Sequence, residues 1–151
     1  MEPVLPSGAA RCDARWSTRA HQYLPHTGTS RTVPVTFHYR RTDPLAVEAV
    51  FRCPSHDDDV VWTLGRDLLS CGISNLAGTG DVVLWPGRGR SRVWLRLGPD
   101  TGHALLSISR PELAAWLRTT YALVPPGTEE EHLDWTPIHR LLSSPRPPHR
   151  T

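Results

Sequence analysis

The chain has 151 residues, 38% of them hydrophobic, and a formal net charge of +2 from 17 basic and 15 acidic side chains. This length fits one domain that buries a core without disulfides or metals, and the even charge gives little support for binding to nucleic acid or anionic lipid through the overall field. No apolar run approaches the roughly 18–20 residues that span a bilayer, so we expect no membrane insertion. Residues 1–10 lack the apolar core of a secretory signal, which predicts a cytoplasmic protein. The cysteines, Cys12, Cys53 and Cys71, form no C-x-x-C pair and are predicted to be reduced, partly buried apolar side chains.

The N-terminal part of the chain predicts little regular structure. Residues 1–10, with two prolines, are expected to be a disordered lead. Residues 11–18 predict a poor first strand because charged side chains interrupt its apolar pattern. Residues 21–30 have the composition of a loop.

The next segments alternate between apolar and polar side chains. This alternation predicts half-buried strands over residues 33–40 and 45–52, and the short turn between them predicts an antiparallel hairpin. The pattern breaks at residues 54–59 and resumes over residues 60–64, which predicts a third strand of this group.

The middle of the chain predicts a short helix and three further strands. Residues 65–69 can form one or two helical turns, which we expect Gly72 to end as a C-terminal cap. Strands are predicted over residues 81–85, 92–97 and 103–109, separated by glycine-rich and proline-containing turns.

A capping box then marks the helix that the sequence predicts most strongly. The Ser109 side chain is expected to accept from the backbone at Glu112, and the Glu112 side chain to accept from the backbone at Ser109. Apolar residues at helical spacing follow, and Pro125-Pro126-Gly127 closes the helix. Residues 134–142 predict a further short helix, and residues 143–151 a disordered tail rich in proline and arginine.

The order of these elements predicts an α+β fold. Short connections favour antiparallel pairing, so we expect a curved antiparallel sheet of six or seven strands with helices on one face. The predicted domain covers residues 11–142.

No catalytic or metal-binding arrangement emerges from the motifs. Residues 56–59, His-Asp-Asp-Asp, lack the alternating oxygen ligands and turn glycine of a calcium loop and are better interpreted as a solvated hairpin tip. Cys71 ends a short helix, where the dipole does not favour a thiolate, so a packing role is preferred. The segment Gly78–Asp81 lacks the lysine and following helix of a phosphate loop. We therefore expect a protein that is not an enzyme and uses no cofactor.

A cluster of arginine and tryptophan is the best candidate for an interaction surface. Three interpretations remain open: arginine stems that cover an outward sheet face, a protein interface, and a single-strand nucleic-acid site. The first is favoured, and a protein interface is favoured over nucleic acid because acidic runs at residues 57–59 and 129–131 would repel a phosphate backbone. The candidate residues are Arg88, Arg90, Arg92, Trp94 and Arg96, with Trp85 nearby.

Four motifs, in order and at compatible spacing over roughly residues 33–142, resemble the SsgA-like family of actinomycete sporulation and cell-division regulators. Each motif alone is mostly turn and core chemistry, and together they are specific. They are Asp43-Pro44-Leu45-Ala46-Val47; Trp62 with Arg66-Asp67-Leu68-Leu69 and Gly72; Gly78-Thr79-Gly80-Asp81-Val82 with Trp85-Pro86; and Val124-Pro125-Pro126-Gly127-Thr128-Glu129.

The resemblance implies a cytoplasmic, non-catalytic protein that acts in septum placement, septation or spore-wall remodelling. It implies partners among division or cell-wall synthesis proteins, either FtsZ-associated machinery or another SsgA-like protein, with recruitment to the septum. It also implies a fold similar to the whirly single-strand-binding fold and assembly as a trimer. The motif residues are interpreted as structural: Asp43-Pro44 and Gly78–Asp81 set turns, Leu68 and Leu69 fill the core, and Trp85-Pro86 ends a strand. Single-stranded nucleic-acid binding by residues 85–96 is the alternative function.

Overall fold

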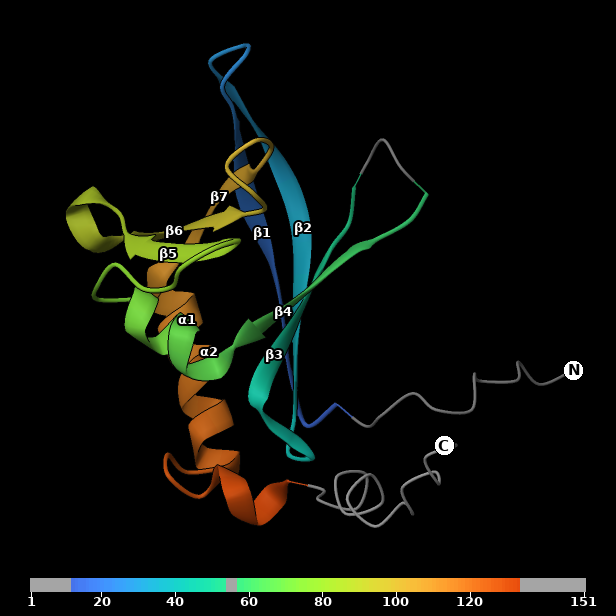
Figure 1. Cartoon of the computed structure of the whole chain (residues 1–151), viewed down its shortest axis with the longest axis vertical. Helices are drawn as coiled ribbons and strands as arrows, with labels where there is room; N and C mark the ends of the chain where they lie inside the picture. The colour runs from blue at the N-terminus through green and yellow to red at the C-terminus, as the bar shows by residue number, and fades with distance from the viewer. Residues whose placement is uncertain (1–11, 54–56, 134–151) are drawn as a thin grey trace, which may run out of the picture.

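The computed structural model describes residues 12–53 and 57–133. One seven-stranded antiparallel sheet, in the order β4-β3-β2-β1-β7-β6-β5, is combined with two α-helices (Figure 1), which confirms the predicted α+β class. The helix predicted over residues 134–142 and both predicted disordered ends lie outside the described residues. The elements are β1 (Ala14–Leu24), β2 (Thr29–Arg40), β3 (Asp43–Phe51), β4 (Val60–Gly65), α1 (Arg66–Gly72), β5 (Val82–Pro86), the 3-10 turn η1 (Arg88–Arg90), β6 (Arg92–Leu97), β7 (Ala104–Ser109), α2 (Arg110–Leu123) and the 3-10 turn η2 (Glu129–His132).

A first strand is present as predicted, but it is longer and more regular than predicted, and the loop predicted after it was wrong. β1 lies inside the sheet, pairs with β2 along its whole length, and also pairs with β7. The loop predicted over residues 21–30 shrinks to the short turn between β1 and β2. Arg15 and Arg19 are exposed while Ala20 is buried, so the charged side chains occupy the solvent face of the strand. An antiparallel sheet with one solvated face accepts this alternation even in an inner strand.

The sheet curls into a half-barrel. Trp62 of β4 and Leu97 of β6 line the same hollow, although their strands are first and sixth in the sheet order. In a flat sheet, five strand spacings of about 4.8 Å would separate them by about 24 Å. The concave face therefore closes around its own side chains, with α1 and α2 covering one end (Figure 1).

Aromatic side chains join α2 to the sheet. Trp16 of β1 stacks on Phe37 of β2 at 4.9 Å between ring centroids, and Trp116 of α2 lies 6.0 Å and 5.8 Å from these two rings. Phe37 is fully buried and Trp116 nearly so. Such aromatic contacts add to the burial of apolar area and fix where α2 crosses the sheet.

The capping prediction for α2 is confirmed in its first half. Ser109 Oγ accepts from Glu112 N at 3.3 Å. The reciprocal bond from the Ser109 backbone to the Glu112 side chain is not among the hydrogen bonds of the described residues, so the full capping box is absent.

The role predicted for Gly72 was wrong. Gly72 is the last residue of α1, and Ile73 follows it in right-handed helical geometry rather than as a left-handed cap. A Cβ at Gly72 would lie 2.5 Å from Leu84 Cβ of β5. Glycine is therefore required by the close approach of α1 to β5, not by its backbone conformation.

Candidate functional site

The β5–β6 hairpin positions the predicted surface. Trp85 and Trp94 lie directly opposite each other, and Val93, Leu95 and Leu97 are buried. Because side chains alternate along a strand, Arg92, Trp94 and Arg96 face outward on the convex side of the sheet. The predicted alternation of β6 is confirmed.

The strand register extends this surface across half the sheet. We call it the Trp/Arg face, and it consists of two rows of cross-strand neighbours together with Arg88, Arg90 and Arg92. The rows are Trp85–Trp94–Ser107–His21 and Val83–Arg96–Leu105–Tyr23, each contributed in turn by β5, β6, β7 and β1.

Arg92 is bound to its own sheet. Its Nη2 donates to the Ser107 carbonyl at 2.7 Å and to Ser107 Oγ at 3.1 Å, and its Nε donates to Ser107 Oγ at 3.2 Å. Burial lowers the pKa of Arg92, and the nearby Glu112 carboxylate partly opposes this shift. Arg92 therefore covers the β6–β7 pair and offers little of its guanidinium to a partner.

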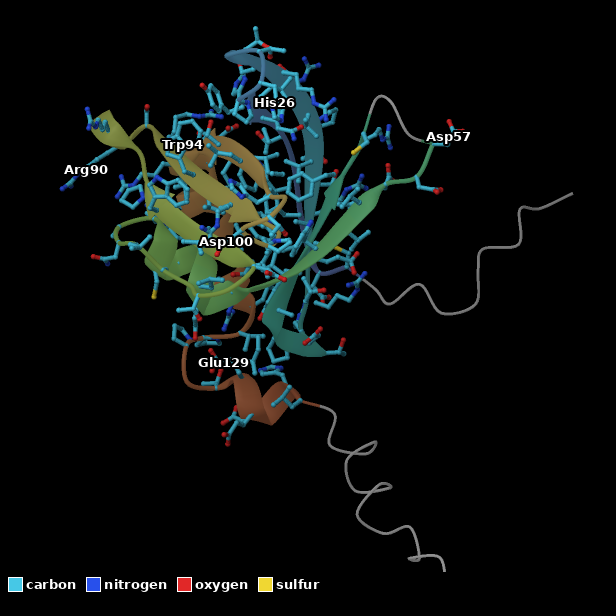
Figure 2. All side chains as sticks on the ribbon, turned by 45° about the horizontal axis from the view of Figure 1, so that its top comes forward. His26, Asp57, Arg90, Trp94, Asp100 and Glu129 are labelled. Carbon is cyan, nitrogen blue, oxygen red and sulfur yellow. The ribbon has the colours of Figure 1, made fainter. Side chains whose placement is uncertain are left out.

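Arg96 is also engaged within the chain. Its Nη1 lies 3.3 Å from Asp100 Oδ1, and its Nη2 donates to the Gly80 carbonyl at 3.2 Å. By contrast, Arg88 and Arg90 in η1 are exposed and make no side-chain hydrogen bond or ion pair with the described residues. Figure 2 shows Arg90 projecting away from the ribbon on the same side as Trp94. The structure thus divides the predicted cluster into two structural arginines and two free ones.

A hollow of about 570 Å³ lies over the tryptophan pair. Trp85, Pro86, Gly87, Arg88, Arg92 and Trp94 line it. A Cβ at Gly87 would lie 3.1 Å from Trp94 Nε1, so glycine lets the backbone pass close to the indole edge. Within residues 12–53 and 57–133 neither indole N–H has an acceptor, which leaves both donors for a bound group.

A second group of contacts, which the sequence analysis did not predict, is centred on Arg66 and joins two of the motifs that resemble the SsgA-like family. Arg66, only 1% exposed, donates from Nη1 to the carbonyls of Thr120 at 3.1 Å and Val124 at 2.8 Å. These acceptors lie at the C-terminal end of α2, where the Thr120 carbonyl also accepts from Val124 N at 3.0 Å and the carbonyl of the cap residue Val124 lies beyond the last helical turn. The guanidinium also lies 4.1 Å from the centre of the Tyr121 ring.

The partner of Arg66 outside α2 is the last residue of the V-P-P-G-T-E motif. Arg66 Nη2 lies 2.9 Å from Glu129 Oε1, and Glu129 Oε2 accepts from Gly127 N at 2.8 Å. Hydrogen bonding to its own backbone N–H lowers the pKa of Glu129, with further contributions from Arg66 and the Gly127 N–H. In the sequence, the only sign of this contact is that one motif contains a basic residue, Arg66, and the other ends on an acidic residue, Glu129.

Other motif residues take the structural places expected of them, with small differences. Leu69 is fully buried, whereas Leu68 is only partly buried. Gly78 and Gly80 have φ of +93° and +78°, as the predicted turn requires. Tyr39 Oη donates to the Pro44 carbonyl at 3.0 Å, which ties the D-P turn to β2.

The remaining candidates add no reactive site. The prediction of partial burial was wrong for Cys71, which is exposed, because α1 turns Leu69 inward and Cys71 outward; Cys12 and Cys53 are partly buried. Asp57–Asp59 are exposed, and His56 lies outside the described residues.

Across residues 12–53 and 57–133 no group of three or more His, Cys, Asp or Glu side chains is placed to hold a metal ion. No helix in the same ranges is both long and apolar enough to cross a membrane.

The curled sheet, its two packed helices and its outward Trp/Arg face define a small α+β protein built on a half-barrel. A family profile described as "Streptomyces sporulation and cell division protein, SsgA" matches residues 33–129. The chain belongs to this family, which confirms the resemblance of its motifs.

Individual relatives agree with the family assignment. The chain is 41% identical to a sporulation-specific cell division protein SsgB of Kineococcus radiotolerans over 146 residues, covering 93% of this chain and 86% of that one. It is also 41% identical to the SsgB of Streptomyces coelicolor over 108 residues, or 70% of this chain and 78% of the relative.

Two solved structures share the fold. One, described as "Mutations in SsgB correlate to longitudinal cell division during sporulation of Streptomyces coelicolor", has a TM-score of 0.72 and 35% identity over 79% of this chain and 94% of that one. The other, an SsgA-like sporulation-specific cell division protein from Thermobifida fusca, has a TM-score of 0.76 and 27% identity over 90% and 98% of the two chains.

Proposed function

We propose that this protein is a non-catalytic adaptor in sporulation-specific cell division and that it acts through protein contacts on the Trp/Arg face. The observation that carries the proposal is the Trp85–Trp94 pair, which faces outward on the β5–β6 hairpin beside a hollow. Its relatives are named sporulation-specific cell division proteins, which supplies the process.

A protein partner fits this face better than a nucleic acid. Single-strand binding needs a basic groove that follows the phosphate backbone. Here Arg92 and Arg96 are bonded within the chain, and Asp100 adds a negative charge beside Arg96. Tryptophan and arginine are, in contrast, the residues most enriched at the centres of protein interfaces. The unpaired indole N–H groups would then donate hydrogen bonds to a partner's carbonyl oxygens.

The proposal also covers where the protein is located in the cell and which proteins it binds. It is cytoplasmic and is recruited to the septum, where it contacts division or cell-wall synthesis proteins, either FtsZ-associated machinery or another SsgA-like protein. Its own copies assemble, with a trimer as the form that the family resemblance implies.

The test is a Trp94→Ala variant in a strain that lacks the wild-type gene. Trp94 is on the solvent side of β6, so the variant should fold, which a melting curve checks. A fluorescent fusion of the variant is expected to lose its septal position and to recover fewer division proteins in a pull-down. The matched control is Leu45→Ala, a 50% exposed apolar residue of β3, which lies in the other half of the sheet order from β5 and β6. Normal septation and unchanged recovery with Trp94→Ala would overturn the proposal.

The nucleic-acid alternative has its own measurement. Binding of a fluorescent single-stranded oligonucleotide is titrated at about 50 mM salt, where phosphate contacts are strongest. We expect no saturable binding. Binding that weakens steeply with salt and is lost on Arg88→Glu would favour nucleic acid instead.

A further inference from the structure

In the part of the chain that the structure describes, the strand β4 forms an unprotected edge of the sheet. Among residues 12–53 and 57–133 its only partner strand is β3, so its other side presents free backbone groups. Its sequence, V-V-W-T-L-G, contains neither a charge nor a proline, the devices by which natural sheets protect an edge. Val60 and Val61 are 44% and 54% exposed. Exposed apolar residues beside free backbone groups favour the addition of another strand.

The opposite edge of the sheet, strand β5, is covered by another segment of the chain, unlike β4. Ala77 and Leu84 exchange both backbone hydrogen bonds, at 2.8 and 2.9 Å, so the segment before β5 shields that strand. The described part of the chain supplies no such cover for β4.

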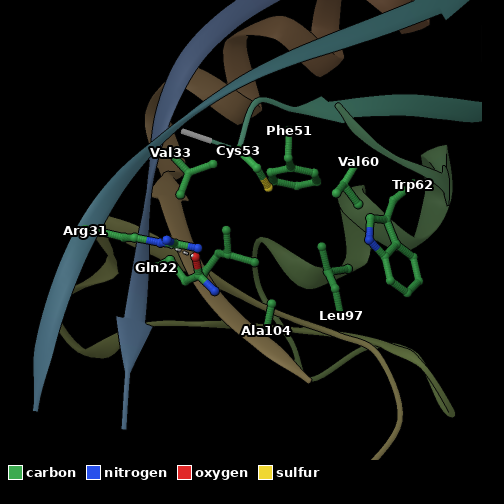
Figure 3. Close-up of a pocket in the computed structure, with 10 residues that line it drawn as sticks. Gln22, Arg31, Val33, Phe51, Cys53, Val60, Trp62, Leu97 and Ala104 are labelled. Carbon is green, nitrogen blue, oxygen red and sulfur yellow. Dashed lines mark hydrogen bonds between the residues drawn. The ribbon is translucent and has the colours of Figure 1, made fainter. Parts of the chain in front are cut away.

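An apolar hollow of about 110 Å³ opens beside β4 on the concave side (Figure 3). Val60 and Trp62 border it from β4, and Leu97 borders it from β6, so it lies in the seam where the half-barrel does not close. This volume lies between the ~30 Å³ share of one water and the ~150 Å³ of a cavity that holds benzene. It therefore suits one aliphatic side chain that enters from a strand added to β4.

The negative charge at the start of β4 favours a partner with basic side chains. Asp57, Asp58 and Asp59 directly precede β4 and are exposed. The cation that the structure places against them is Arg52, whose Nε is 4.0 Å from Asp59 Oδ1 and whose side chain is 78% exposed. One ion pair at this distance in water neutralises little of three carboxylates. The beginning of β4 thus attracts basic side chains.

We propose that the open edge of β4 binds an extended, basic segment of another protein as an additional antiparallel strand. The segment places one aliphatic side chain in the hollow beside Val60 and Trp62. Because an antiparallel strand would end next to the start of β4, its C-terminal residues are Lys or Arg beside Asp57–Asp59. Main-chain hydrogen bonds supply affinity in this mode and the pocket supplies specificity. This site lies on the concave side and goes beyond the proposed function, which uses the convex Trp/Arg face.

The probe is a synthetic peptide of this pattern, acetyl-Thr-Val-Thr-Leu-Arg-Arg-amide with a fluorescent label, titrated against the full-length protein by anisotropy. We expect saturable binding that weakens with salt. A peptide with Val and Thr exchanged at the second and third positions breaks the alternation and should bind at least about tenfold more weakly. N-methylation of alternate peptide bonds should abolish binding, because a strand addition depends on main-chain donors.

Variants of the protein test the location. Val61→Lys places a charge on the edge and should weaken binding about tenfold or more, and Asp58→Asn with Asp59→Asn should reduce both the affinity and its salt dependence. Leu76→Lys is the matched control, since Leu76 is a more exposed apolar residue outside the edge, and should bind as the wild type does. All of these positions are exposed, so folding should persist. Absence of binding up to millimolar peptide, or equal binding by Val61→Lys and the wild type, would overturn the proposal.

Hydrogen exchange on the full chain separates the possible occupants. If a partner segment is the occupant, the outward amides of β4 exchange fast in the free protein and slow down when the peptide is added. Slow exchange that depends on protein concentration would assign the edge to a second copy of this chain. Slow exchange that does not depend on concentration would assign it to the chain's own terminal segments, and either result contradicts the proposal.

Discussion

Arg66 and Glu129, which are 63 positions apart in the sequence, form a 2.9 Å ion pair beneath the end of α2. The pair joins the motif that begins α1 to the turn that follows α2. Its arginine also donates to two carbonyls of the helix end. A single buried side chain therefore holds three segments of the protein together.

Replacing Arg66 with methionine tests this arrangement. The change removes the arginine donor from the Thr120 and Val124 carbonyls and from Glu129, although Thr120 O still accepts from Val124 N and Glu129 Oε2 from Gly127 N. Leaving a buried acceptor without its donor typically costs about 1–3 kcal/mol. We expect a loss of that order in the free energy of unfolding, measured by urea denaturation. Arg88→Met, at an exposed arginine of η1, should change stability by no more than about 0.5 kcal/mol. A loss below about 1 kcal/mol for Arg66→Met would contradict this role.

Glu129 should make stability depend on pH in the acid range. Its pKa in the folded protein lies below the ordinary value of 4.5. A lowered carboxyl pKa adds stability above the unfolded pKa, and this stability is lost as the pH falls through the folded pKa. The wild type should therefore lose stability on acidification below the ordinary value more steeply than Glu129→Gln does. Parallel stability curves for the two proteins, measured by denaturation from neutral to acid pH, would show that Glu129 does not contribute.

Tyr39 should titrate late at alkaline pH. Burial raises the pKa of Tyr39 to about 12, an effect that the Arg66 charge partly opposes. Because the folded pKa is raised, the associated stability is present below the unfolded pKa and is lost as the pH rises through the folded pKa. Ultraviolet titration of phenolate absorbance should show a last step near this value in the wild type. Tyr39→Phe should lack that step, and its persistence in the variant would refute the assignment.

Gly72→Ala tests the close packing of α1 on β5. The added Cβ would lie 2.5 Å from Leu84 Cβ, which forces the helix away from the strand. Overpacking of this kind typically costs about 1–3 kcal/mol, which a shift in the urea midpoint would reveal. Gly102→Ala is the matched control because a Cβ there meets no atom within 4 Å. Equal stability of the two variants would mean that α1 adjusts without cost.

Local patterns predicted the parts of the fold that local chemistry controls. The alternation of residues 33–40 and 92–97 determined which side chains face the core, because a strand has a period of two whatever its neighbours are. The first strand was predicted to be short and poor because of its charges, but charges along an inner strand are acceptable once one face of the sheet is solvated. The Trp/Arg cluster was found from its composition, but which arginines are free depended on Ser107 and Asp100.

The sequence by itself determined the α+β class, the family motifs and the outward direction of Trp94 and its neighbours. These properties follow from periodicity, turn residues and capping, which act over a few positions. Only the tertiary structure decided that Arg66 is buried against Glu129, that Gly72 meets Leu84, and that residues 12–53 and 57–133 leave a seam open beside β4. The physical reason is that these contacts join residues brought together by the curl of the sheet, and neither that curl nor the contacts across it can be deduced from the spacing of residues along one strand.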